Sequence, residues 1–144
     1  MPRVQIDIPS TAPKCTLHIP VRITDVNYGN HVGNDSMVSI IHEARMQFLK
    51  KYGFSEMNAG GTALIMSDIA ISFKKESFYG DILEVNIYPV ITSRLSFELI
   101  YQITAVRNNE SILIALAQTT MVCFDYEKRR VAPMTDALKH LLEQ

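Results

Sequence analysis

Residues 25–53 read DVNYGNHVGNDSMVSIIHEARMQFLKKYG and combine a loop rich in glycine and asparagine with one long helix. Glycine and asparagine tolerate positive φ, so residues 25–34 predict a shaped loop and not a regular element. The apolar spacing that follows predicts a helix over 35–52, capped at its start by Asn34 or Asp35. The rest of the fold depends on what this helix needs to lie against.

The predicted helix has a single apolar face. At about 100° per residue, this face consists of Met37, Ile40, Ile41, Ala44 and Phe48. The opposite face is polar and holds Asp35, Ser36, Ser39, Glu43, Gln47 and Lys50. Gly53 is placed to end the helix. A helix of this length with one apolar face requires a broad apolar surface beside it.

The other segments predict that surface as an antiparallel β-sheet. Alternation and β-branched or aromatic residues mark strands over 17–23, 62–75, 82–90, 95–107 and 111–126, with Pro20 placing the first strand at an edge or a bulge. Short turns separate the last four strands, which makes them antiparallel neighbours. An extended lead-in over 1–14 and a short helix over 135–142 complete the chain. We therefore expect an α+β fold with a long antiparallel β-sheet wrapped around one central α-helix, in a single domain spanning 1–144.

Composition and charge exclude several classes of protein. The 144 residues suit one domain, and 47% hydrophobic with 20% charged residues are typical of a globular protein. The net charge of −1 gives no basic face for nucleic acid, and Lys128-Arg129-Arg130 is interpreted as a solvated turn. Cys15 and Cys123 form no metal-binding or disulfide pattern, so we expect no metal and no cofactor. Without a signal peptide or a membrane-spanning stretch, we expect a cytoplasmic protein with no membrane partner.

The loop and the helix together resemble a known signature. The stretch from 25 to 45 is similar to the signature of hotdog thioesterases of the 4-hydroxybenzoyl-CoA thioesterase group, D-x-D-x-x-G-H-V-N-N followed by a helix with E-E-A-R. The residues in register are Asp25, His31, Val32, Asn34, Glu43, Ala44 and Arg45. The sequence FYGDILEV at 78–85 resembles the family's Y-G-D-x-L-E-V turn and strand. The resemblance implies the hotdog fold, an acyl-CoA or acyl-carrier-protein thioester as substrate, and a homodimer or homotetramer with sites shared between subunits.

Three positions depart from that signature. Asn27 stands where many members carry the catalytic aspartate, Asn30 replaces a glycine, and Gly33 replaces the first asparagine of the pair. An aspartate would attack the thioester carbonyl or activate water, and an amide can do neither. The resemblance therefore transfers the fold more directly than the chemistry.

The start of the helix is the candidate site for binding the thioester carbonyl. Backbone amides around Val32, Gly33 and Asn34 would point outward there, where the helix dipole favours an oxyanion. Lys74 and Lys75, near the end of a predicted strand, are candidates to contact the phosphates of CoA. The alternative interpretations are an ordinary helix start and two solvated surface lysines.

Four side chains are candidates for the catalytic chemistry. Asn27 could hold a water molecule or the thioester oxygen, and His31 could orient the loop or transfer a proton. Asp35 and Glu43 are the carboxylates of the helix, and Glu43 is preferred as the base because another hotdog thioesterase group uses a carboxylate from this helix. The structural alternatives are an Asx turn at Asn27, a hydrogen-bonding His31, a capping Asp35 and a solvated Glu43.

Two other functions remain open beside thioester hydrolysis. A hotdog hydratase would carry D-x-N-P-x-H; here no proline follows Asn27, and His31 lies one residue too far along. A non-catalytic protein that binds acyl-CoA would explain the loss of the aspartate at position 27. The lack of a G-x-S-x-G motif argues against a Ser-His-Asp hydrolase.

Overall fold

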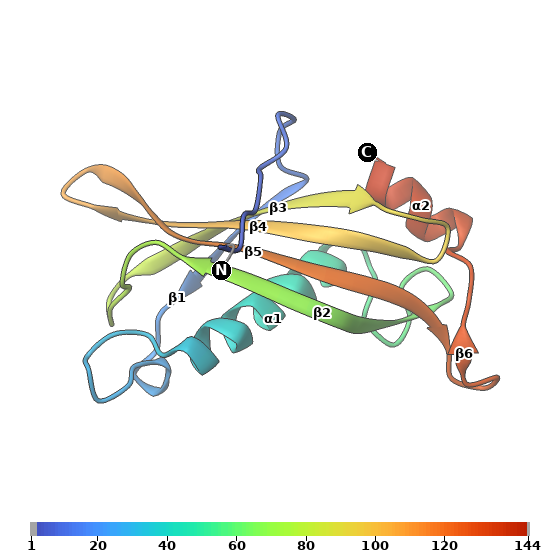
Figure 1. The fold of residues 1–144 in the computed structure, drawn as a ribbon, viewed down its shortest axis with the longest axis horizontal. Coiled ribbons are helices and arrows are strands. Elements are labelled where there is room, and N and C mark those ends of the chain that lie inside the picture. Colours follow the sequence, from blue (N-terminus) through green and yellow to red (C-terminus); the bar gives the residue numbers. More distant parts are fainter. Residues whose placement is uncertain (1–2, 144) are drawn as a thin grey trace.

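A computed structural model describes residues 3–143 and confirms the expected α+β fold. Its elements in chain order are β1 (Cys15–Pro20), a 3-10 helix (Ile23–Asp25), α1 (Asn34–Lys51), β2 (Ala63–Phe73), β3 (Ile82–Ile91), β4 (Ser96–Arg107), β5 (Glu110–Asp125), β6 (Arg130–Val131) and α2 (Asp136–Glu143). Figure 1 shows the long strands running side by side, with α1 beneath them. Among the described residues, no helix has both the length and the apolar character needed to span a membrane.

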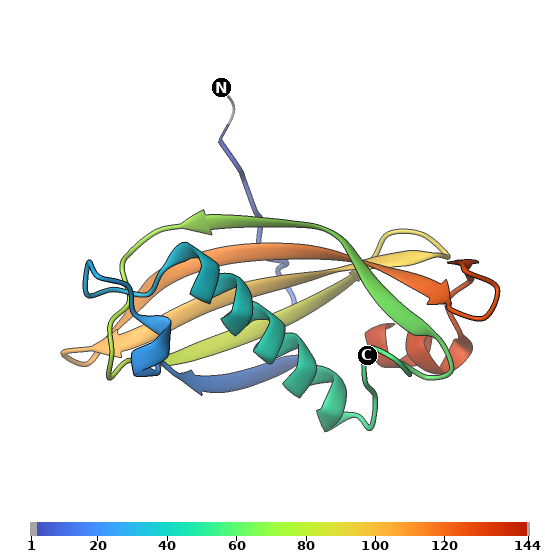
Figure 2. The same ribbon diagram turned by 90° about the horizontal axis from the view of Figure 1, so that it is seen from below.

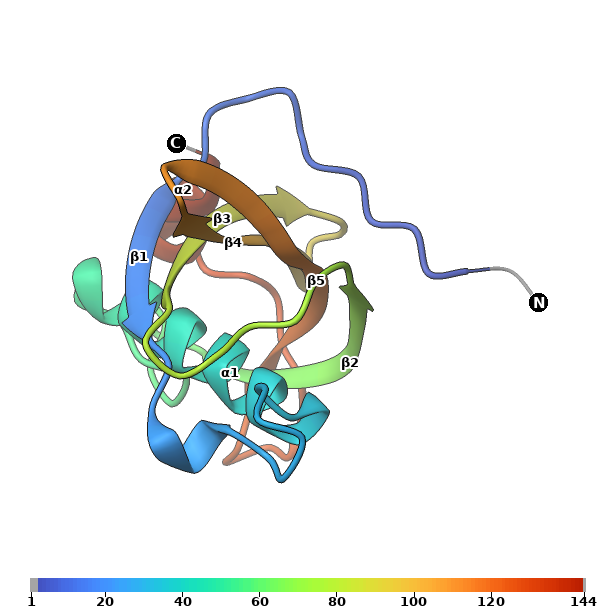
Figure 3. The same cartoon turned by 90° about the vertical axis from the view of Figure 1, so that its left-hand side faces the viewer.

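The sheet is antiparallel throughout and follows the order β1-β3-β4-β5-β2, with β6 added to β5. It curves around α1, which crosses its concave side (Figures 2 and 3). The β4–β5 hairpin closes at Asn108 and Asn109, both with positive φ (53° and 64°), as a tight hairpin turn requires. Helix and sheet are thus arranged as the hotdog fold requires.

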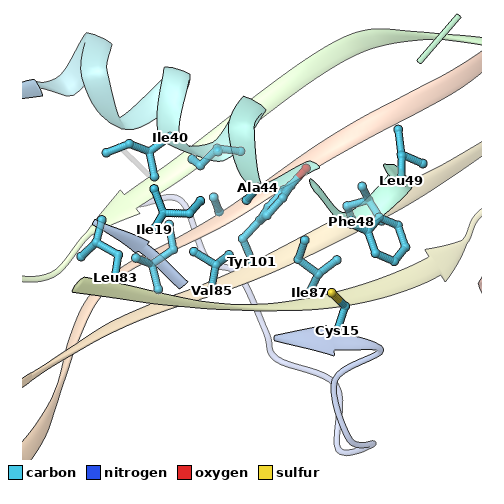
Figure 4. Packing of buried hydrophobic residues seen from close by; sticks show 14 of the residues in the cluster. Cys15, Ile19, Ile40, Ala44, Phe48, Leu49, Leu83, Val85, Ile87 and Tyr101 are labelled. Carbon is cyan, nitrogen blue, oxygen red and sulfur yellow. The ribbon is translucent and has the colours of Figure 1, made fainter. Parts of the chain in front are cut away.

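The core lies between α1 and the sheet, as the helical pattern predicts. The five residues of the predicted apolar face are each at most 3% exposed: Met37, Ile40, Ile41, Ala44 and Phe48. Figure 4 shows Ile40, Ala44 and Phe48 facing sheet residues that include Val85 and Ile87. Each large apolar side chain buried in this way contributes about 1.5–3 kcal/mol to folding.

Arg45 introduces a charged group into this core. The residue is 4% exposed, and its Nη1 donates to Tyr101 Oη at 3.4 Å. Tyr101 Oη lies 2.8 Å from Thr119 Oγ1, so two buried hydroxyls satisfy each other. Burial raises the pKa of Tyr101, which keeps the phenol neutral.

The outer face of the sheet carries the N-terminal segment. Figure 3 shows this segment leaving the sheet on the side opposite α1. Ile6 is buried there against Tyr88 and Ile100 and forms a small second apolar cluster. The extended lead-in therefore packs against the sheet and is more than a spacer.

Three details differ from the sequence-based expectations. The first strand spans Cys15–Pro20, and Ile23 lies in a 3-10 helix because the carboxylate of Asp25 accepts the Arg22 amide at 2.8 Å and turns the chain. The cap of α1 is Gly33, and neither Asn34 nor Asp35 caps the helix, because both already belong to it. The short β6 was not predicted.

Candidate active site

The loop before α1 is a tight turn built around Asn27. The backbone amide of Asn27 donates to His31 O at 2.9 Å, and the amide of Asn30 donates to Asn27 O at 3.1 Å. The side-chain Oδ1 of Asn27 accepts the amide proton of Gly29 at 2.8 Å, which is the Asx turn expected of this residue. Asn30 has φ of 66°, a conformation that asparagine adopts more readily than most residues.

The turn fixes the orientation of the Asn27 side-chain amide. Because an N–H only donates, the atom facing Gly29 N is the oxygen, and Nδ2 points elsewhere. A Cβ built on Gly33 would lie 3.7 Å from this Nδ2 and 2.7 Å from Asp35 Oδ1. The side chains of Asn27 and Asp35 therefore approach the same side of Gly33, in the space that a Cβ would need.

Two backbone hydrogen bonds anchor the residues that immediately precede α1. Val32 N donates to Ser77 O at 2.8 Å, and Gly33 N donates to Asp25 O at 3.1 Å. Asp25 is itself buried, at 4% exposure, and its carboxylate accepts from Arg22. The loop is therefore held to the segment that links β2 and β3, and Asp25 of the signature has a structural role.

The N-terminal end of α1 has backbone amides that are available to bind a ligand. The amide of Met37 donates to Gly33 O at 3.0 Å, which is the first bond of the helix. The amides of Asn34, Asp35 and Ser36 precede it and have no carbonyl acceptor within the helix. Such amides, together with the positive end of the helix dipole, favour an oxygen that carries negative charge.

His31 has one ring nitrogen engaged and the other free for chemistry. Nδ1 lies 3.1 Å from Val32 O. Because a carbonyl oxygen can only accept, Nδ1 carries the proton, and Nε2 of the neutral ring keeps its lone pair. The ring of His31 is half-buried. The acceptor nitrogen Nε2 lies beside the loop that precedes α1, 3.3 Å from a Cβ built on Gly29.

A pocket of about 210 Å³ brings five of the predicted residues together. Its lining includes His31, Val32 and Asn34 from the loop and helix, and Lys74 and Lys75 from the segment after β2. Met37 and Phe73 add an apolar wall. Both lysines are exposed, and their backbone amides donate to Ile114 O at 2.8 and 3.1 Å. Two segments far apart in the sequence thus form one polar cavity with an apolar side.

Glu43 lies apart from this pocket. It belongs to a different pocket, of about 460 Å³, between α1 and β1, whose lining also includes Asp25 and Gln47. Gln47 donates a 2.7 Å hydrogen bond to the Glu43 carboxylate. Glu43 lies nine positions after Asn34, or about 13 Å further along the helix axis. The structure does not bring Glu43 to His31 within one chain.

Sequence reasoning missed Ser77, which lines the pocket, and it missed Asp81 and Arg107, which hold the segment around Ser77 in place. Ser77 lines the pocket directly. Arg107 donates to Asp81 Oδ2 at 2.6 Å and to Glu76 O at 2.8 Å, so it ties the segment around Ser77 to the end of β4. Burial raises the pKa of Asp81, but the hydrogen bonds from Arg107 and from the Phe78 amide, together with the charge of Arg107, outweigh burial and lower it. The Gly-Asp turn pattern was the only signal of this arrangement in the sequence.

Comparison with known proteins places this geometry in a family. The model of the thioesterase-like superfamily matches residues 21–142, which is most of the chain. No curated protein matches the chain. The 1,4-dihydroxy-2-naphthoyl-CoA thioesterase Slr0204 from Synechocystis is similar in structure, with a TM-score of 0.79, 26% identity, and coverage of 90% of this chain and 95% of that one.

Two similar structures contain coenzyme A. A thioesterase from Thermus thermophilus, complexed with coenzyme A and Zn, has a TM-score of 0.75 and 21% identity over 92% of this chain and 94% of its own. The protein SAV2348 from Staphylococcus aureus, in complex with CoA, has a TM-score of 0.78 and 15% identity over 89% of this chain and 80% of its own. At these identities, the likeness shows the shared fold. The family match and the fold agree, and the chain belongs to the thioesterase-like superfamily of thioester hydrolases.

Proposed function

We propose that this protein hydrolyses fatty or aromatic acyl-CoA thioesters at the pocket where α1 begins. The observation that carries the proposal is the pocket itself, which combines His31, the N-terminal end of α1 and two lysines. Superfamily membership supplies the class of reaction. An acyl-carrier-protein thioester is the alternative substrate, since it presents the same reacting bond.

The reaction follows from the donors and the acceptor in the pocket. The thioester oxygen lies at the amides of Asn34 and Asp35, which stabilise the negative charge that develops on it. His31 Nε2 takes a proton from a water molecule whose oxygen attacks the carbonyl carbon. The tetrahedral intermediate then expels the CoA sulfur, and the proton returns from His31 to that sulfur. The products are a carboxylic acid and free CoA.

Asn27 and Asp35, which both approach Gly33, support this reaction. The Nδ2 of Asn27 is a donor for the water or the intermediate, and its position is set by the bond from Gly29 to its oxygen. Asp35 supplies the negative charge nearest the start of the helix, and we assign it the role of a second base. Glu43, preferred from sequence, is a weaker candidate because it lies in the other pocket.

The proposal of a CoA thioester rests on charge and on the similar structures. Lys74 and Lys75 are exposed at the pocket and would meet the phosphates of CoA as point charges. Slr0204 is named for an aromatic acyl-CoA, and two other similar structures hold CoA. An aromatic or medium-length acyl group would lie against Met37 and Phe73.

A second copy of the chain is proposed to complete the site. The pocket of about 210 Å³ is smaller than the ~300–1,000 Å³ of typical ligand pockets. It lies at the end of β2, whose outer edge has no partner strand among residues 3–143. Phe73 at that end is 50% exposed and Met66 within the strand is 40% exposed. A C₂ dimer, or a tetramer built from such dimers, would cover this edge and enlarge the pocket.

We also propose a single-domain organisation, based on the core, and a cytoplasmic location, based on the cysteines. One continuous core joins α1 to all five long strands. Cys15 and Cys123 are both free and buried, which suits a reducing compartment.

The direct test is hydrolysis of an acyl-CoA panel that includes octanoyl-CoA and benzoyl-CoA. Release of CoA is followed with a thiol-trapping dye, and saturable turnover of at least one substrate is expected. Binding of acyl-CoA without turnover would instead support the non-catalytic binding protein. Water addition to an enoyl-CoA without hydrolysis would support the hydratase.

A further inference from the structure

Ser77 contributes a buried hydroxyl that no protein group satisfies. The residue is 3% exposed, and its Oγ has no hydrogen-bond partner among the described residues. The only other buried side-chain atom of this kind in residues 3–143 is Arg45 Nε, which lies 3.5 Å from the Glu56 carboxylate. Buried hydroxyls are nearly always paired, so an unpaired one requires an explanation.

The position of Ser77 supplies that explanation. Its carbonyl oxygen accepts the Val32 amide at 2.8 Å, which sets Ser77 directly beside the start of α1. Ser77 lines the same pocket as His31 and Asn34. A group that enters this pocket to reach the N-terminal end of α1 therefore lies against Ser77.

The chemistry of the hydroxyl identifies its partner. Leaving Oγ unpaired costs free energy in the ligand-free protein, and a molecule in the pocket that accepts its proton recovers this free energy. The neighbouring amides are donors, so an oxygen that they bind is the natural acceptor for the Ser77 proton. We propose that Ser77 Oγ donates a hydrogen bond to the carbonyl oxygen of the bound acyl thioester, as a further catalytic residue. This inference rests on the proposed hydrolysis at the same pocket.

The proposal predicts opposite effects on stability and on catalysis. Ser77→Ala removes an unpaired hydroxyl, so the thermal midpoint should stay the same or rise. Loss of one oxyanion donor should lower kcat by at least about 10-fold. Ser77→Cys keeps the volume but has a weak donor, so it should lose activity in the same way, whereas a packing defect would be restored by the larger side chain.

Thr119→Val is the matched control, because Thr119 is a fully buried residue whose hydroxyl is paired with Tyr101 at 2.8 Å. Its substitution should lower the midpoint by roughly 2–4 °C or more and leave kcat within about twofold. A Ser77→Ala protein that is destabilised like Thr119→Val and retains full kcat would overturn the proposal.

A binding measurement separates this inference from the proposed hydrolysis. The ketone analogue of octanoyl-CoA, with a methylene in place of sulfur, keeps the carbonyl and cannot be hydrolysed. Ser77→Ala should weaken binding of this ketone by about 3–10-fold and leave the affinity for CoA unchanged. If wild-type protein hydrolyses acyl-CoA but Ser77→Ala matches it in both assays, Ser77 is not a donor and the proposed function stands. If wild-type protein hydrolyses nothing, the proposed function fails, and the ketone binding alone decides the role of Ser77.

Discussion

Arg107 and Asp81 form the ion pair with the shortest N–O distance in the described part of the chain. Nη2 donates to Oδ2 at 2.6 Å, and Nε donates to Oδ1 at 3.3 Å. The side chains are only 25% and 12% exposed. Arg107 also binds Glu76 O, and its guanidinium lies 4.9 Å from the centre of the Phe78 ring. This pair therefore holds the segment that carries Ser77 against the end of β4.

We predict that Asp81→Asn lowers the free energy of unfolding by about 1–3 kcal/mol at pH 7, because it removes a hydrogen-bonded charge that is largely buried. The native pKa of Asp81 is lowered, so its contribution is present above the unfolded pKa, about 3.9, and is lost as the pH falls below it. Urea unfolding at pH 7 and pH 3 checks this.

The difference between Asp81→Asn and wild type should shrink at pH 3. Glu143→Gln is the control, because its pair with Lys139 is exposed and 3.9 Å long, and it should change little at either pH. An equal loss at both pH values would mean that the charge of Asp81 is not what stabilises the turn.

The contrast between Ile41 and Arg107 shows what the sequence could predict. Ile41 is assigned to the core by the helical period alone, and the structure buries it fully. The strands are also found, because alternation and turn residues are local signals. Arg107 meets Asp81 from 26 residues away, and no local pattern records such a contact. The same holds for Val32 and Ser77, so the sequence indicated the helix side of the pocket but not the opposite wall.

His31 should be the residue whose loss costs most activity. We predict that His31→Gln lowers kcat by about 10²–10⁴-fold, because glutamine cannot take the proton that Nε2 accepts. His18→Gln is the control, since His18 lies on β1, its side chain is 62% exposed, and its Nε2 lies 3.5 Å from the Glu84 carboxylate. Steady-state hydrolysis of octanoyl-CoA measures both. A loss under about fivefold for His31→Gln would leave Asp35 as the base.

Asn27→Asp should keep or raise the hydrolysis rate. An aspartate can still accept the Gly29 amide with one oxygen, and it places the other oxygen where Nδ2 now faces Gly33. In the proposed site, the substitution adds a carboxylate beside the reacting carbonyl, as in the usual family signature. A folded Asn27→Asp protein with less than a tenth of the wild-type kcat would show that the amide donor matters more than a base at this position.

Protein in solution should have a mass of at least twice 16.3 kDa, as measured by light scattering across micromolar concentrations. In the proposed dimer, a second copy covers the unpaired edge of β2 and enlarges the small pocket. A stable monomer with full activity would show that one chain builds the whole site.

Glu43→Gln decides between the two pockets. The variant keeps the size of the side chain and can still bond to Gln47, so folding should be unaffected. If catalysis takes place where α1 begins, Glu43 lies about 13 Å along the helix axis from the reacting carbonyl. Hydrolysis should then fall less than about fivefold.

A loss of about 10² or more, the range expected for a general base, would move the reaction to the pocket beside β1 or to a site that Glu43 shares with a second copy. His31→Gln, measured on the same substrate, distinguishes these outcomes, because both variants lose activity only if the partner's helix brings Glu43 to the His31 pocket.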